Sequence, residues 1–164
     1  RVADCMVKVG EVYSTSQNSD QLYVLQFVTR DTTQLNSDVV AIWKMSTETW
    51  QSYSYDTLPE PDLFLHTTVL AGIRQSLWHK IGTAEIVDFH KVKFKSDAQD
   101  SLDIDDPDER ESRIWHVWKI GKKWKTIKKA LFDDESIYPG AAFPPEMVDY
   151  IVKHGHRALF DSGL

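Results

Sequence analysis

The sequence contains one cysteine, Cys5, among 164 residues. A single cysteine excludes an internal disulfide framework and a thiolate zinc site, and it fits a reducing compartment. The seven glycines are isolated from one another, which excludes the Gly-rich turns of Walker and dinucleotide-binding motifs. No apolar run approaches the ~20 residues that a membrane-spanning helix needs, and we expect no signal peptide. The sequence therefore predicts a cytoplasmic protein without a membrane partner.

Catalytic and metal-binding motifs are also missing. The six histidines are scattered and form no HExxH pattern, so we expect them at the surface or in interfaces. No serine stands in a GxSxG elbow. Residues capable of acid–base chemistry are present, but no spacing selects a set of them. We therefore expect no metal, no other cofactor, no catalytic residues and no enzymatic activity.

The overall composition is that of an ordinary globular protein, with 41% hydrophobic and 27% charged residues. Six Trp, six Tyr and seven Phe favour large contact areas and β structure. The length suits one domain, which we place over 1–164. A net charge of −6 argues against a general nucleic-acid binder, since phosphate contacts need clustered Lys and Arg, and is compatible with a basic protein partner.

Apolar alternation predicts an α+β fold with a mainly antiparallel twisted sheet and two short helices. The segment 22–30 is apolar on both faces, which is typical of a central strand or a closed sheet. Further strands are expected at 6–13, 39–45, 63–69 and 91–95, the last with three lysines pointing outward. Helices are expected over 69–78, capped by Thr68, and over 145–154. The segment 48–61 reads as an aromatic loop or irregular edge strand.

The most unusual stretch is the acidic run 97–111, which holds eight acids and one arginine and so carries a charge of −7. It has too few aliphatic residues to form a buried core, and Pro107 interrupts any helix. We interpret 97–112 as an acidic insertion in the domain. It serves either as a solvated segment that keeps the protein soluble or as a concentrated negative field for a partner.

A basic hairpin follows, with strands expected at 113–120 and 123–129 and a two-residue turn at Gly121-Lys122. Its tryptophans alternate with lysines, a mixture that single-stranded nucleic-acid binders use for stacking and backbone contacts. Alternatively, the hairpin simply buries its Trp, exposes its Lys and pairs with the acidic run inside the folded chain. We favour the second interpretation, because the adjacent charge of −7 would repel a polyanion, and we expect no nucleic-acid partner.

Two stretches resemble a known family. The opening KVGEVYSTSQNSDQLYVLQFV is similar to the start of the bacterial immunity protein 26 family, with its KxGD-like turn and Tyr-containing strand. LFLHTTVLAGIRQSLWHKIG is similar to that family's strand, short helix and Trp-x-x-Ile-Gly element. Glu11 replaces the usual Asp, and beyond about residue 95 only the order of strands is similar. The resemblance implies an SH3-like start and a stoichiometric inhibitor of a polymorphic or contact-dependent bacterial toxin.

The composition and the resemblance together predict an immunity protein whose partner is the C-terminal domain of a cognate toxin, a nuclease. Carboxylates that occupy a basic nuclease cleft steer association and raise its rate by ~10–10³-fold. Exposed aromatic side chains supply the desolvated anchors of such an interface. The residues expected to bind the toxin are Asp103, Asp105, Asp106, Asp108, Glu109, Trp50, Tyr53 and Tyr55. A single-stranded nucleic-acid binding module built on the Trp/Lys hairpin is the alternative function.

Overall fold

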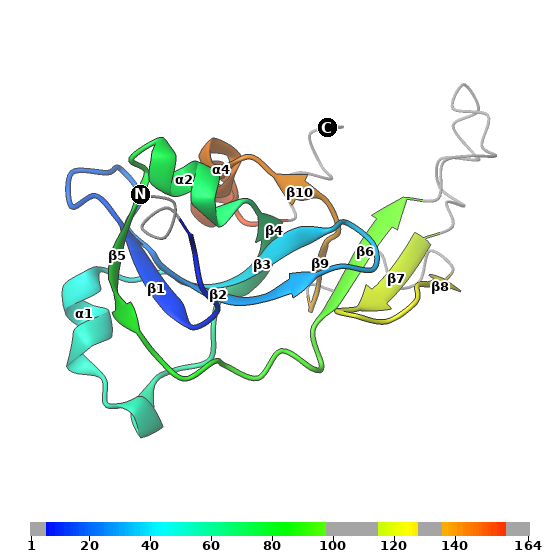
Figure 1. Ribbon diagram of the computed structural model, residues 1–164, viewed down its shortest axis with the longest axis horizontal. Helices are drawn as coiled ribbons and strands as arrows, with labels where there is room; N and C mark the ends of the chain where they lie inside the picture. Colours follow the sequence, from blue (N-terminus) through cyan, green and yellow to red (C-terminus); the bar gives the residue numbers. More distant parts are fainter. Residues whose placement is uncertain (1–5, 98–114, 128–135, 157–164) are drawn as a thin grey trace.

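The computed structural model describes residues 6–97, 115–127 and 136–156, and it has the predicted α+β fold with mostly antiparallel sheets. Six strands form one sheet in the order β10-β4-β3-β2-β1-β5 and four form another in the order β8-β7-β6-β9 (Figure 1). The strands of the first sheet are β1 (Glu11–Thr15), β2 (Val24–Asp31), β3 (Ser37–Trp43), β4 (Leu63–Thr67), β5 (Trp78–Thr83) and β10 (Ala142–Phe143). Those of the second are β6 (Lys93–Asp97), β7 (Trp115–Lys119), β8 (Lys125–Ile127) and β9 (Ile137–Pro139). The helices of the described residues are α1 (Thr47–Ser52), the 3-10 helix η2 (Tyr55–Thr57), α2 (Val69–Arg74) and α4 (Pro145–His154).

Strand β2 lies inside the first sheet, and its apolar residues are buried on both faces, as the sequence predicted for 22–30. Tyr23, Leu25 and Phe27 belong to the first core cluster, whereas Val28 belongs to the second. A register shift between Phe27 and Thr29 interrupts the pairing with β3. The six-stranded sheet is therefore a central layer with a core on each side.

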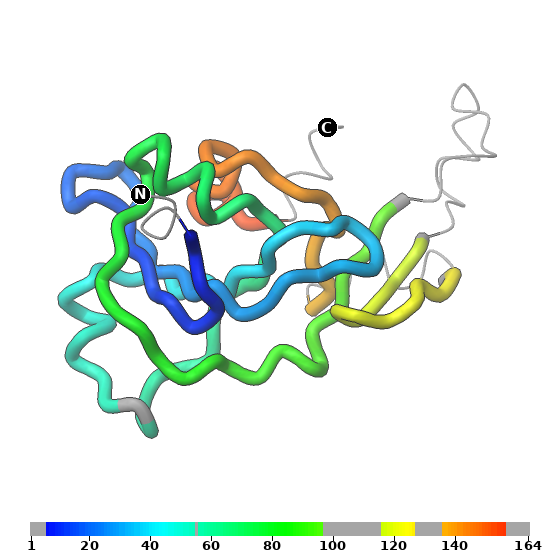
Figure 2. Tube along the Cα trace, in the orientation of Figure 1, coloured from blue at the N-terminus to red at the C-terminus, as the bar shows by residue number. Residues whose placement is uncertain are grey.

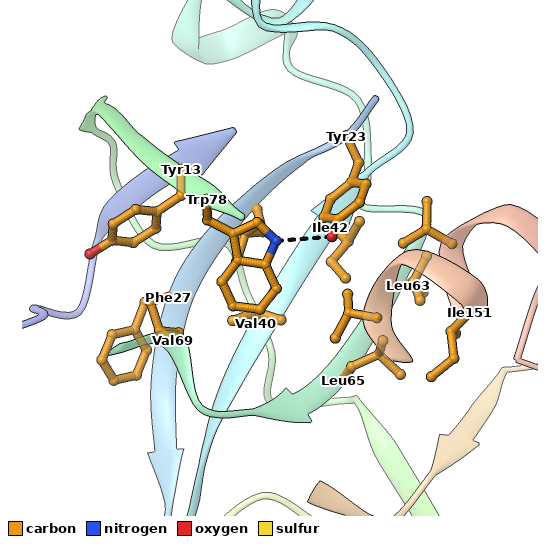
Figure 3. Packing of buried hydrophobic residues seen from close by; sticks show 13 residues of the cluster. Tyr13, Tyr23, Phe27, Val40, Ile42, Leu63, Leu65, Val69, Trp78 and Ile151 are labelled. Atoms are coloured by element: carbon orange, nitrogen blue, oxygen red, sulfur yellow. Dashed lines mark hydrogen bonds between the residues drawn. The ribbon is translucent and has the colours of Figure 1, made fainter. Parts of the chain in front are cut away.

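The first core cluster joins one face of this sheet to helices α2 and α4. Val69 of α2 and Val148, Ile151 and Val152 of α4 pack with strand residues around Trp78 (Figure 3). The Trp78 indole N–H donates to the Tyr23 hydroxyl at 2.9 Å, and that hydroxyl donates to the Asp149 carboxylate. Helix α2 can lie this close only because its residue 72 is glycine: a Cβ there would come within 2.0 Å of Trp78 Cε3.

The second core cluster fills the space on the opposite face. Val28, Val39, Ala41, Trp43 and Phe64 of the first sheet pack against Phe94 and Trp118 of the second. The connection 84–92, which runs from β5 to β6 (Figure 2), adds Val87, Phe89 and Val92 to it. The smaller sheet and its connection thus cover the face that the helices leave open.

The predictions for two segments that contain helices were wrong. The segment 48–61 forms α1 and η2 rather than a loop or edge strand, because Ser46 caps α1 by accepting a hydrogen bond from Thr49 N. The helix expected over 69–78 ends at Arg74, and Trp78 begins β5.

The prediction of a two-residue turn at Gly121-Lys122 was wrong, because β7 ends at Lys119 and β8 begins only at Lys125. Within this connection Lys122 N donates to Lys119 O, and Gly121, with φ +75°, stands at the second central position of that turn. Lys95, expected to point outward, is buried, because β6 is an inner strand of the second sheet. Within the described residues, no helix has both the length and the apolar character needed to cross a membrane.

Candidate protein-binding surface

A contiguous acidic–aromatic segment, residues 46–62, connects β3 to β4. It contains four acids (Glu48, Asp56, Glu60 and Asp62) and no lysine, arginine or histidine. All four acids are exposed. Figure 1 shows α1 and the following turn projecting from one end of the six-stranded sheet. The segment therefore presents a local charge of −4, with Glu48 in α1, Asp56 in η2, and Glu60 and Asp62 in the chain that follows.

Hydrogen bonds fix the C-terminal end of this segment to the end of β3 and to Lys44. The Trp43 indole N–H donates to Pro59 O at 2.8 Å. Asp62 N donates to Ile42 O at 2.8 Å, and the Asp62 carboxylate accepts from Lys44 N at 2.6 Å. Within the segment, Ser54 N donates to the Thr57 hydroxyl at 3.0 Å, which closes η2. The segment is preorganised, so little conformational entropy is left to lose when a partner binds.

The three aromatic residues expected to bind the toxin take different positions. Trp50 is half-buried and packs against the second core cluster, so it supports the segment more than it projects from it. Tyr53 is 40% exposed and directly follows α1. Tyr55 begins η2. The predicted acids Asp103, Asp105, Asp106, Asp108 and Glu109 lie outside the described residues, as does most of the acidic run.

A buried polar network lies where the two sheets meet. The Asp31 carboxylate accepts from Thr33 N at 3.2 Å and Thr33 Oγ1 at 2.9 Å through Oδ1. Its Oδ2 lies 3.0 Å from His66 Nε2 and accepts from Trp118 Nε1 at 3.1 Å. The His66 ring also meets Phe94 edge-on, with the ring centroids 4.2 Å apart. Residues of β2, β4 and β7 are thereby joined through one carboxylate.

Burial and hydrogen bonding have opposite effects on the pKa values of the two ionisable groups of this network, Asp31 and His66. Burial by itself would raise the pKa of Asp31, but hydrogen bonds from His66, Thr33 and Trp118 outweigh it and hold that pKa below its usual value. Burial lowers the pKa of His66, and the Asp31 carboxylate opposes this only in part. Among the described residues, His66 Nδ1 has no hydrogen-bond partner. With both side chains fully buried, the pair cannot reach a substrate and has a structural role.

Sequence reasoning missed this network by expecting histidines at the surface. The signal was present in the strand LFLHT, where alternation puts Leu63 and Leu65 on one face and Phe64 and His66 on the other. A histidine that replaces an apolar residue in such a pattern is buried and needs a polar partner. Asp31 stands at the end of the two-faced strand β2, within reach of that position.

A pocket of about 420 Å³ opens beside β1, β5 and α2. Its apolar lining comes from Met6, Val7, Leu70, Ile73 and Trp78, and its polar lining from Glu11, Tyr13, Ser76, His79 and Lys80. Burial by itself would raise the pKa of Glu11, but Lys80, at 2.9 Å, and the Lys8 backbone N–H lower it below its usual value. Burial, followed by the charge of Glu11, raises the pKa of Tyr13. The Glu11 carboxylate and the Lys80 ammonium of this pocket therefore pair with each other.

No cluster of His, Cys, Asp or Glu side chains in the described part of the chain is arranged to hold a metal ion. The comparisons with known proteins supply no relative: no protein-family model, no curated protein and no solved structure matches this chain. The resemblance to the immunity protein 26 family therefore stays a prediction from the sequence.

Proposed function

We propose that this protein is an immunity protein that neutralises a cognate bacterial toxin, a nuclease acting in the cytoplasm, by stoichiometric binding without catalysis. The observation that carries the proposal is the acidic–aromatic segment 46–62, which combines four exposed carboxylates with the exposed Tyr53 on a supported element. It is a second concentration of carboxylates in the sequence, separate from the acidic run 97–111.

The physical basis is electrostatic complementarity. A nuclease binds phosphates through a basic cleft, and an inhibitor that presents carboxylates to that cleft associates faster because long-range attraction guides the encounter. Charges alone seldom supply high affinity at an exposed rim. Tyr53 provides what they lack: an amphipathic ring whose burial against a partner can contribute at the level of an interface hot spot.

The test uses the toxin fragment encoded beside the gene, purified in an inactivated form. Binding kinetics are measured for the wild type and for the triple variant Glu48→Gln, Asp56→Asn and Glu60→Gln, which removes charge at nearly constant shape. Asp62 is left intact because its carboxylate bonds to Lys44 N. The matched control neutralises three exposed acids outside the segment: Asp20→Asn, Glu85→Gln and Asp88→Asn.

The triple variant should associate more slowly and with a weaker dependence on salt, whereas the control should keep most of the wild-type rate. Tyr53→Ala should accelerate dissociation, with a loss of about 2 kcal/mol if Tyr53 is a hot spot. No binding between the wild type and the neighbouring toxin fragment would refute the proposed function. Binding that neither variant weakens would exclude segment 46–62 as the contact surface.

A further inference from the structure

The β7–β8 hairpin exposes an aromatic platform that core packing does not explain. Trp118 enters the second core cluster, but Trp124 is 46% exposed and belongs to neither core cluster. Its indole stacks on the His116 ring with the centroids 3.8 Å apart and the planes 18° from parallel. The expectation that the hairpin buries its tryptophans therefore holds for Trp118 and is wrong for Trp124.

The charge around this platform has one sign. Residues 115–127 include Lys119, Lys122, Lys123 and Lys125, all exposed, and no acid. Gly121, with φ +75°, forms part of the turn between β7 and β8. Lys119 and Lys125 therefore lie on neighbouring strands, and Lys122 and Lys123 lie in the connection between them. The described hairpin thus carries a charge of +4 beside an exposed indole, on a protein whose net charge is −6.

We propose that this hairpin binds single-stranded nucleic acid. His116 covers one face of the Trp124 indole, so a nucleobase stacks on the opposite face while the lysines contact phosphates of the same strand. Base stacking on an aromatic ring tolerates any sequence, since every base has a π face. This binding site goes beyond the proposed toxin inhibition and does not depend on it: the hairpin and segment 46–62 lie toward opposite ends of the long axis in Figure 1.

Two other polyanionic partners fit the hairpin less well. A membrane surface requires apolar side chains at the tip that enters the lipid, but the tip here is Gly121, Lys122 and Lys123, and Ile120 packs against the core. An acidic peptide would pair with the lysines but offers no flat partner for the indole. A single strand uses both features at once, because its bases and phosphates alternate along one chain.

The experiment measures binding of the full chain to a fluorescein-labelled oligothymidylate of about 10 nucleotides, within the ~4–16 that single-strand binding domains occupy. Anisotropy titrations are repeated from about 50 to 200 mM salt, a range over which phosphate contacts weaken measurably. Each phosphate contact on a single strand contributes about −0.7 to the slope of log K against log salt, so four lysines predict a slope near −3.

Two variants separate stacking from charge. Trp124→Leu should weaken binding by about 5- to 150-fold, the range measured for losing one stacked base, and should leave the salt slope unchanged. Trp124→Phe should restore most of the affinity, which a merely structural role of the indole would not predict. Lys122→Gln with Lys123→Gln and Lys125→Gln should reduce the slope by about 2. The matched control changes three exposed lysines elsewhere, Lys44→Gln, Lys91→Gln and Lys153→Gln, and should keep the slope.

Three results would overturn the proposal. The first is an absence of oligonucleotide binding by the wild type at 50 mM salt. The second is an equal loss in the hairpin and control lysine variants, which would mean diffuse attraction without a site. The third is binding to phosphatidylserine vesicles or polyglutamate that matches oligonucleotide binding and does not respond to Trp124→Leu, which would assign the hairpin to a different polyanion.

Discussion

Acidification should destabilise this protein through His66, well above the pH at which carboxylates titrate. The imidazole Nε2 faces Asp31, and Nδ1 is buried with no hydrogen-bond partner in the described part of the chain. Protonation would place a second N–H at Nδ1. No acceptor in the described residues bonds to it there, and burial has removed the water that would solvate it in the unfolded chain. The folded state therefore resists protonation, and the pKa of His66 lies below its usual value.

The sign and size follow from proton linkage. An unfolded histidine titrates near pH 6.5, so below that pH the unfolded chain binds a proton that the native chain refuses, and stability falls as pH falls. The slope reaches at most ~1.4 kcal/mol per pH unit for one proton. The free energy of unfolding of a protein is usually ~5–15 kcal/mol, so a loss of this size over one pH unit is substantial. Asp31, whose pKa is also lowered, adds a second loss below about pH 4, where the unfolded carboxyl takes up its proton.

The assay is urea denaturation at pH 7.5, 6.5 and 5.5, compared between the wild type and His66→Gln. Glutamine keeps an N–H within reach of Asp31 and does not titrate, so the variant should lose the part of the pH dependence that His66 contributes. His79→Gln, at an exposed position, is the control and should behave as the wild type. Equal pH dependence in the wild type and His66→Gln would refute this reasoning.

Three further outcomes test the packing and the charges. Gly72→Ala should cost ~1–3 kcal/mol by overpacking against Trp78, and less when combined with Trp78→Leu, which urea denaturation of the single and double variants measures. Tyr23→Phe should cost ~1–3 kcal/mol by the same measurement, because the Trp78 N–H is left buried without an acceptor. The third variant changes four acids to asparagine: Asp103, Asp105, Asp106 and Asp108. It should slow toxin association in stopped-flow experiments yet tighten oligonucleotide binding by anisotropy, and unchanged values in both would make the acidic run a solvated insertion.

The strands with a strong apolar pattern could be predicted from the sequence. A strand that is buried on both faces consists largely of consecutive apolar residues, and such a run is recognised without knowledge of distant contacts. The two-sided pattern of β2 and the apolar runs of β3 and β4 belong to this group. Helix α4 could also be predicted, since Pro144-Pro145 stands at its start and Gly155 at its end. In each case the residues that determine the element are neighbours in the chain.

Elements stabilised by distant partners could not be read in this way. Strand β5 alternates poorly, and it forms because β1 supplies its hydrogen bonds from more than 60 residues away in sequence. Strands β9 and β10 are short parallel additions to β6 and β4. Helix α1 has no apolar stripe, and its Trp50 is held by the second core cluster. For the candidate site, the exposure of Tyr53 could be predicted from the sequence, but not that Trp50 is half-buried while Trp124 is exposed.

The second core cluster supports both proposed binding surfaces. Trp50 and Leu58 reach it from segment 46–62, and Trp118 and Ile120 reach it from the hairpin. A change in its interior should therefore weaken toxin binding and oligonucleotide binding together, through folding. A change at Tyr53 or Trp124, each exposed and outside that cluster, should affect one activity alone. Separable losses would thus identify direct contacts, and a joint loss from either exposed position would point to a folding defect instead.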